Sequence, residues 1–215
     1  MMTSMHNIFK ARIFAFFLTL FFFGTPLTSS SLYAENIYHL DPNSSQIEFT
    51  AVGKPGFLRI NGKGARIVGH AKVEKKQIAG TFTTKLDDFV TGIEARDQHM
   101  REVYLQTNKF PNAKLDLNME LVEIHKDRQE FPFTATLNLH GVPKPIEGQA
   151  ILTVAKDRSK VDGEVQFQIK LSDFNIAIPK YLGITVAEDV TVKATFTAIT
   201  TSPVAGSGRD PSLMH

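Results

Sequence analysis

The segment Asn112-Ala-Lys-Leu-Asp-Leu-Asn-Met-Glu-Leu121 alternates apolar and polar residues without interruption. Its apolar residues share one face, and they are Ala113, Leu115, Leu117, Met119 and Leu121. A period of two is typical of a β-strand that buries one face and exposes the other. We therefore predict a strand here, with its apolar face turned toward a core.

The same alternation recurs on both sides of this segment. Six further runs show it, at residues 46–52, 77–87, 131–139, 146–154, 160–171 and 190–198. Segments with turn chemistry separate the runs, at residues 53–56, 61–62, 126–128, 141–143 and 156–159, and they are typical of hairpin connections. Seven to nine strands at this spacing predict an all-β antiparallel meander, which forms either a sandwich or a closed barrel.

One segment departs from the alternation and predicts a single short helix. Thr91-Gly-Ile-Glu94 fits the S/T-x-x-E capping box, which marks a helix start. Met100, Val103 and Tyr104 then share a helical face, and the helix is expected to end at residues 108–111.

The first 34 residues have the composition of a secretory signal peptide. Lys10 and Arg12 precede the apolar run Ile13–Phe23, which is shorter than the roughly 20 residues of a spanning helix. We predict cleavage after Ala34 and a periplasmic protein, with an uncleaved membrane anchor as the alternative. The expected domain is 35–200, followed by a Ser-, Gly- and Pro-rich disordered tail at 201–215.

Composition excludes several classes of function. The chain has no Cys, which excludes disulfides, thiol catalysis and Cys-based metal sites. Loss of Lys10 and Arg12 with the signal peptide leaves 22 of the 24 basic side chains, equal to the 22 acidic ones. A mature chain with no formal net charge gives no electrostatic indication of nucleic-acid binding. The 17 Phe with 4 Tyr and no Trp indicate an interior built from rings without a polar group.

Segments in a fixed order resemble the YceI-like, polyisoprenoid-binding proteins. Tyr38–Ser45 with Ile47-Glu-Phe49 is similar to the family's opening Y-x-h-D-P-x-H-S-x-I-x-F, and Arg96–Met100 is similar to R-D-x-H-[LM]. Ala135–Pro145 is similar to the hairpin G-x-L-T-[IL]-x-G-x-T-[KR]-P. The other matching segments are Gly92, Lys109-Phe-Pro111 and Leu171-Ser-Asp-Phe174. The resemblance covers about residues 37–199.

This resemblance implies an eight-stranded antiparallel lipocalin-like barrel with one short helix, holding an isoprenoid lipid such as a quinone or a polyprenyl chain. Two departures fall where a head group would be recognised. The family's His-x-G pair on the second strand is absent from residues 51–57, and Asn43 or Ser44 stands where the opening motif has His. The resemblance therefore implies tail binding and leaves the head group open.

The apolar faces of the predicted strands supply candidate lining residues. They are Phe49, Phe82, Leu115, Leu117, Phe133, Leu137, Phe167, Ile169 and Phe196. An eight-stranded barrel has an interior just wide enough for one slender ligand, and such a wall favours a hydrocarbon tail. The alternative is ordinary core packing, because periodicity shows which face is inside and not whether the inside is full.

Polar candidates are few. Arg96 and His99 are expected at the barrel mouth, facing a ligand head group; alternatively Arg96 ties the helix to a strand and Asp97 stabilises the helix start. Residues 140–145 indicate a tight hairpin. The mature histidines lie singly on different predicted elements, at His39, His70, His99, His125, His140 and His215, so we expect no metal site.

No catalytic motif is present, and the adjacent Asp87 and Asp88 point to opposite faces of a strand. We therefore expect neither catalysis nor a cofactor other than a bound isoprenoid lipid, and no membrane insertion after signal cleavage. The leading interpretation is a periplasmic carrier for a long-chain isoprenoid. The alternative is a ligand-free barrel that acts through its surface as a stress-response or adhesion module. The sequence leaves open whether two barrels form a homodimer.

Overall fold

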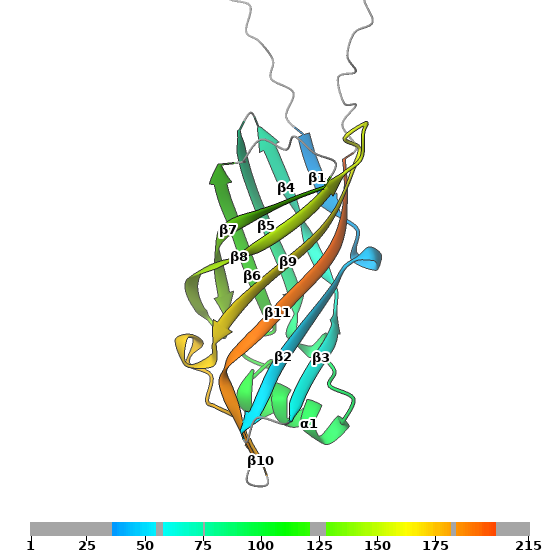
Figure 1. Ribbon diagram of the computed structural model, residues 1–215. Coiled ribbons are helices and arrows are strands. Elements are labelled where there is room, and N and C mark those ends of the chain that lie inside the picture. Colours follow the sequence, from blue (N-terminus) through cyan, green and yellow to red (C-terminus); the bar gives the residue numbers. More distant parts are fainter. Residues whose placement is uncertain (1–35, 55–57, 75, 121–127, 182–183, 201–215) are drawn as a thin grey trace, which may run out of the picture. The chain divides into compact units, whose positions relative to one another are not determined.

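In the computed structural model, the described residues are 36–54, 58–74, 76–120, 128–181 and 184–200, and they form an antiparallel β-barrel (Figure 1). The strands are β1 (Asn36–Leu40), β2 (Gln46–Lys54), β3 (Arg59–Ala65), β4 (Ile67–Glu74), β5 (Gln77–Lys85), β6 (Asn112–Glu120), β7 (Arg128–Leu139), β8 (Val142–Val154), β9 (Lys160–Lys170), β10 (Lys180–Tyr181) and β11 (Ile184–Thr200). The helical segments are η1 (Pro42–Ser44), η2 (Leu86–Asp88), α1 (Glu94–His99), η3 (Met100–Tyr104) and η4 (Leu171–Phe174).

Eight strand positions close the barrel. β1 and β2 occupy one position, because both pair with β11. β1 pairs with the end of β11, where Tyr38 lies opposite Thr200, and β2 pairs with most of the remaining length of β11. β3 and β4 occupy the next, since β3 pairs with β2 and β4 with β1. β5, β6, β7, β8, β9 and β11 complete the ring, and the β1–β11 pairing closes it. The predicted eight-stranded antiparallel barrel with one short helix is confirmed.

The break between β1 and β2 is held by short polar side chains. Asp41 caps η1 by accepting from the Asn43 N–H at 2.9 Å and from the Ser44 hydroxyl at 2.7 Å. Ser45 then accepts from the Ile67 N–H at 2.9 Å, which joins the first split position to the second. These side chains satisfy backbone groups that would otherwise lack partners where the strands are interrupted.

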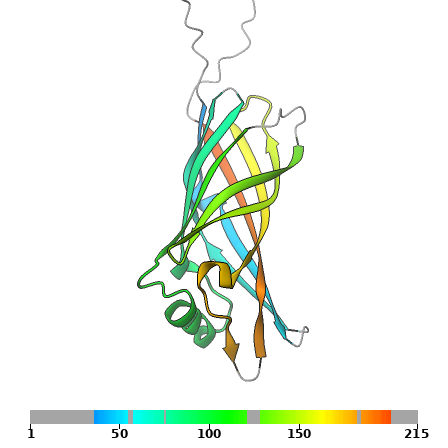
Figure 2. The same cartoon turned by 90° about the vertical axis from the view of Figure 1, so that its left-hand side faces the viewer.

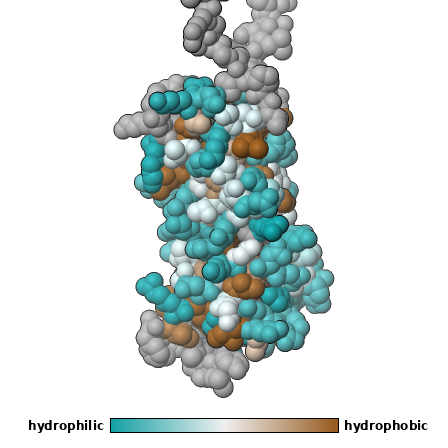
Figure 3. Space-filling view, turned by 90° about the vertical axis from the view of Figure 1, so that its right-hand side faces the viewer, coloured by the Kyte–Doolittle hydropathy of each residue, from teal (hydrophilic) through white to brown (hydrophobic). Residues whose placement is uncertain are grey.

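Inward and outward residues alternate as predicted. In β7, Phe131, Phe133, Ala135, Leu137 and Leu139 are buried, and the residues between them are exposed or only half-buried. The outer face in Figure 3 is mostly hydrophilic, with scattered apolar patches. Ion pairs cross it, such as Lys160–Asp162 at 2.9 Å, and exposed pairs of this kind contribute little to stability. The fold therefore depends on the apolar interior.

The helical segment lies at one end of the barrel, near β10 (Figure 2). Here α1 continues into η3, a π-helical turn. The predicted capping box is wrong, because Ile93 occupies the N-cap and makes no side-chain cap. Val103 is 48% exposed, so it does not share an inward face with Met100 and Tyr104.

Two predicted turns need correction. Residues 61–62 lie inside β3, where Gly62 faces inward as part of a strand. The hairpin predicted at 141–143 turns one residue earlier, at His140 and Gly141, whose φ angles of 53° and 75° are typical of a two-residue type I′ turn. The sequence analysis also missed β1, β3 and β4, because β1 is short and inward glycines interrupt the alternation of the other two.

Some predictions fall outside the described residues. The signal peptide at 1–34, the tail at 201–215 and most of the turn at 126–128 are among them. Within the described ranges, no helix has the length and apolar character needed to cross a bilayer.

Candidate ligand cavity

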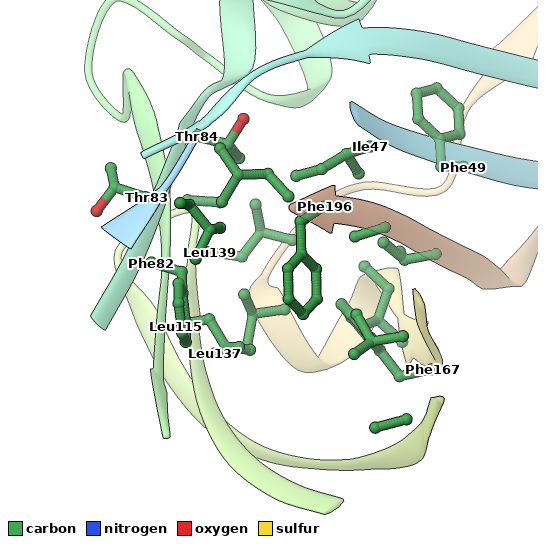
Figure 4. A pocket seen from close by; sticks show the side chains of 18 of the residues that line it. Ile47, Phe49, Phe82, Thr83, Thr84, Leu115, Leu137, Leu139, Phe167 and Phe196 are labelled. Carbon is green, nitrogen blue, oxygen red and sulfur yellow. The ribbon is translucent and has the colours of Figure 1, made fainter. Parts of the chain in front are cut away.

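The barrel encloses a cavity of about 1380 Å³. All nine sequence-predicted lining residues lie on its wall, as do the two predicted mouth residues, Arg96 and His99. Figure 4 shows Phe49, Phe82, Leu115, Phe167 and Phe196 projecting from different strands around this space. The interior is therefore hollow, and the solid core that the sequence left open is absent along this stretch.

The exposure of the inward side chains is consistent with a hollow interior. Among the nine lining residues, only Phe133, Leu137 and Ile169 are buried, at 5%, 7% and 9% exposure. The others are half-buried although they point inward, and they are Phe49, Phe82, Leu115, Leu117, Phe167 and Phe196. A close-packed interior would bury them fully, so part of their surface faces the cavity.

Four phenylalanines on the wall lie directly opposite glycines of the neighbouring strand. The register pairs are Phe49 with Gly62, Phe82 with Gly69, Phe133 with Gly148 and Phe196 with Gly163. The rings lie over these glycines so closely that an added Cβ would come within 3.0 Å of a ring carbon at each one. A glycine inside a strand often marks a site where another group approaches the backbone closely. The sequence analysis did not identify these glycines as part of the site.

Further ring contacts hold the aromatic side chains to the wall. Phe133 and Phe167 meet edge to face, with ring centroids 6.4 Å apart and planes at 89°. Phe49 and Phe89 make a similar contact, with centroids 5.6 Å apart. Such edge-to-face pairs are favourable beyond the area they bury.

A polar network stands at the helical end of the cavity. Buried Asp97 accepts from the Thr91 N–H at 2.8 Å and from the Thr91 hydroxyl. Arg96 donates from Nε to Thr91 Oγ1 at 2.7 Å and from Nη2 to the Thr91 carbonyl at 2.8 Å. Asp97 and Arg96 therefore fix the segment before α1, and the prediction that Arg96 ties the helix to a strand is wrong. Arg96 also borders the cavity.

His99 is exposed and borders the cavity at the same end. Its ring meets Tyr104 edge to face, with centroids 5.2 Å apart. The Tyr104 hydroxyl accepts from the Lys180 N–H at 3.2 Å, so η3 is linked to β10. This arrangement puts one imidazole and one phenol at the rim.

The opposite end of the cavity carries basic side chains that the sequence analysis did not single out. Lys76 comes from the turn before β5, and Lys156 and Arg158 come from the turn before β9. The Tyr38 hydroxyl donates to the Arg158 carbonyl at 2.9 Å, and burial raises the pKa of Tyr38 while the charge of Arg158 opposes the rise. Among the described lining residues there is no Asp or Glu.

The remaining histidines do not form a metal cluster within the described residues. Strand pairing brings His39 and His70 together on the outer face, with ring centroids 5.9 Å apart, but no third ligand from the described part of the chain joins them. His140 lies in the hairpin turn as predicted, where its Nδ1 is 3.1 Å from the Phe174 carbonyl and its ring packs on Phe110.

A closed eight-stranded antiparallel barrel around a large apolar cavity defines the lipocalin-like class of β-barrel proteins. Within that class the sequence gives a closer assignment. The chain belongs to the YceI-like domain family, whose model matches residues 38–198.

Individual relatives agree with this assignment. The chain is 34% identical to Protein YceI of Shigella flexneri over 99 residues, which cover 44% of this chain and 48% of the relative. The match thus spans about half the length of that curated relative. Two solved structures share the fold, each with a TM-score of 0.59. A polyisoprenoid binding domain from Saccharophagus degradans is 19% identical, and the match covers 76% of this chain and 98% of that one. BcnA from Burkholderia cenocepacia is 16% identical, and the match covers 74% of this chain and 98% of that one.

Proposed function

We propose that this protein is a periplasmic carrier or sequestering protein for a long-chain isoprenoid lipid of the quinone or polyprenyl type. The observation that carries the proposal is the apolar cavity of about 1380 Å³ inside the barrel. The polyisoprenoid binding domain of Saccharophagus degradans, which shares the fold, supports the choice of ligand class.

The size of the cavity matches a long chain. A methylene group occupies about the volume of a water molecule in the liquid, ~30 Å³, so the cavity has room for roughly 45 carbon atoms. Each buried methylene contributes about 0.8 kcal/mol. Burial of the tail alone therefore gives substantial affinity without any charged contact. Non-covalent binding free energies in general do not exceed about 20 kcal/mol.

The charged groups on the wall favour a head group that is neutral or anionic. Arg96 and His99 stand at the helical end, and Lys76, Lys156 and Arg158 stand at the other. With no carboxylate among the described lining residues, a cationic head group would meet only like charge or neutral groups. A quinone ring with carbonyl acceptors, or a polyprenyl phosphate, fits this chemistry.

The alternative function is a ligand-free barrel acting through its surface, and a filled interior would favour it. The interior instead holds a large cavity, which favours lipid binding.

Export is the second part of the proposal, and it rests on residues 1–34. Protein recovered from the periplasmic fraction of a bacterial host is expected to begin at Glu35 by N-terminal sequencing. Recovery of a chain beginning at Met1 from the cytoplasm would contradict export.

Carriage is tested by extracting the purified mature protein with organic solvent and analysing the extract by mass spectrometry. We expect an isoprenoid lipid in stoichiometric amount. Leu117→Gln puts a polar side chain on the cavity wall and is expected to lower recovery. Asn118→Gln puts the same side chain on the exposed face of β6 and is the matched control. An empty extract, with no binding of added ubiquinone or polyprenol, would refute the proposal.

A further inference from the structure

The phenylalanine–glycine pairs occur in four pairs of neighbouring strands. They link β2 with β3, β5 with β4, β7 with β8 and β11 with β9, so eight of the strands each contribute one member. The four rings therefore come from β2, β5, β7 and β11, of which β2 and β11 are neighbours in the sheet. Each ring rests where the neighbouring strand has no side chain.

At two of the glycines, the atoms nearest to an added Cβ all belong to the opposing ring. For a Cβ built on Gly163, the three nearest atoms all belong to the Phe196 ring, at 2.2, 2.6 and 2.7 Å. For Gly62 they all belong to the Phe49 ring, at 2.1, 2.3 and 2.9 Å. A methyl group at either position would therefore displace the ring. At Gly69 and Gly148 a backbone carbonyl is also within 2.5 Å, so a change there would disturb the strand itself.

The cavity gives a displaced ring free space to move into. Phe196 stands between β9 and the cavity, and the cavity is the adjacent space without protein atoms. The interior of a protein resists deformation of its backbone more than the rotation of a side chain into a void. A methyl group at Gly163 is therefore expected to turn the Phe196 ring into the lumen.

We propose that Gly62 and Gly163 are specificity-determining residues, which set the width of the cavity by giving the opposing rings a place on the wall. The width decides the class of chain that enters. A methyl-branched isoprenoid chain needs a wider channel than a linear acyl chain, and rings seated on glycine provide it. This inference rests on the proposed function for the identity of the ligand and on geometry alone for the width of the cavity.

The test compares two alcohols with main chains of equal length, geranylgeraniol, which is methyl-branched, and 1-hexadecanol, which is linear. Displacement of the apolar fluorophore N-phenyl-1-naphthylamine measures the affinity of each. Gly163→Ala is expected to weaken geranylgeraniol binding about tenfold and hexadecanol binding less than about threefold, where tenfold corresponds to 1.4 kcal/mol. Gly62→Ala is expected to do the same, and it replaces Gly163→Ala should that variant not fold.

Two controls isolate the ring. Removing the ring in Gly163→Ala/Phe196→Leu is expected to restore geranylgeraniol binding. Ala79→Val adds carbon atoms to the exposed face of β5 and is expected to change neither affinity. Equal weakening of both alcohols by Gly163→Ala and Gly62→Ala, or no weakening at all, would overturn the inference.

A second measurement separates this inference from the proposed function. Xenon enters dry apolar cavities whatever the natural ligand is. The ¹²⁹Xe chemical shift and exchange in the presence of the protein are expected to indicate less xenon uptake by Gly163→Ala than by the natural chain. If the unsubstituted protein takes up xenon but binds neither alcohol, lipid carriage is refuted and the role of the glycines is not. Unchanged xenon uptake in both glycine variants would refute the role of the glycines alone.

Discussion

Two phenylalanines illustrate the two kinds of interior in this barrel. Phe174, in η4, is 1% exposed and packs in the buried cluster with Leu171 and Ile176. Phe196, in β11, is only half-buried although it points inward, because part of its ring faces the cavity. The same residue type thus fills a solid region beside the helical end of the barrel and lines a hollow region in the middle. The difference shows that inward orientation and close packing are separate properties.

The two regions should differ most in how much free energy of unfolding is lost when each ring is removed. Phe174→Ala is expected to lower the free energy of unfolding by about 3–5 kcal/mol, because it leaves a cavity in a packed region. Phe196→Ala is expected to cost about 1–2 kcal/mol, since less of its apolar surface is lost from burial. Urea unfolding followed by far-UV circular dichroism measures both, because the chain has no Trp. Equal costs would mean that the middle of the barrel is packed as tightly as the end.

The polar network at the helical end of the cavity should also be sensitive to substitution. Asp97→Ala removes the acceptor of the Thr91 N–H and hydroxyl and is expected to cost about 2–3 kcal/mol. Asp173→Ala, which changes an exposed carboxylate in η4, is the control and is expected to cost less than about 0.5 kcal/mol. The same unfolding assay measures both. A small effect at Asp97 would show that Arg96 and Thr91 hold the segment without it.

Enlarging a side chain should also distinguish a packed position from one on the cavity wall. Ala135→Leu enlarges a buried residue that does not border the cavity, and we expect a loss of about 1–3 kcal/mol from overpacking. Ala113→Leu enlarges a half-buried residue on the cavity wall, and we expect a change below about 0.5 kcal/mol because the new carbons enter free space. Thermal unfolding of the two variants side by side measures the difference. A loss at Ala113 as large as that at Ala135 would contradict a hollow middle.

The smallest effect is expected outside both regions, at the exposed carboxylate of Asp162. Hydrogen bonds from Thr197 and Lys160 lower the pKa of this carboxyl below its ordinary 3.8. A pKa that is lower in the folded state stabilises the fold above pH 3.8, and this contribution is lost as the pH falls through the folded value. Asp162→Asn should therefore cost a few tenths of a kcal/mol at pH 7 and nothing at strongly acidic pH, because the pair is exposed. A cost that persists at acidic pH would indicate a role other than charge.

The period-two pattern predicted most of the long strands of the barrel wall and left open whether they form a sandwich or a closed barrel. It assigned β6, β7 and β9 with nearly their observed bounds, and it selected nine residues that all border the cavity. The alternation records which face meets apolar surroundings, and that information is local in sequence. The eight strand positions came from the family resemblance, since β3 and β4 gave no clear pattern.

The hollow itself was not predictable from the pattern, because it depends on residues that are distant in sequence. Gly163 and Phe196 become neighbours only through the pairing of β9 with β11. Thr91 resembled a helix cap by spacing, but its hydroxyl contacts Asp97 and Arg96 instead. The useful signal was a glycine at an inward position of a strand, which indicates that a neighbouring group occupies the space of the missing side chain.

The central claim is that a long apolar chain lies inside the barrel, along a wall of rings seated on glycine. Isotope-filtered nuclear Overhauser spectroscopy with ¹³C-labelled protein and unlabelled polyprenol tests it most directly. The account predicts cross-peaks from the lipid methyl groups to the Leu117 methyl groups and to the Phe196 ring, and none to Val68 on the exposed face of β4. Cross-peaks to Val68 alone, with none to Leu117 and Phe196, would contradict it.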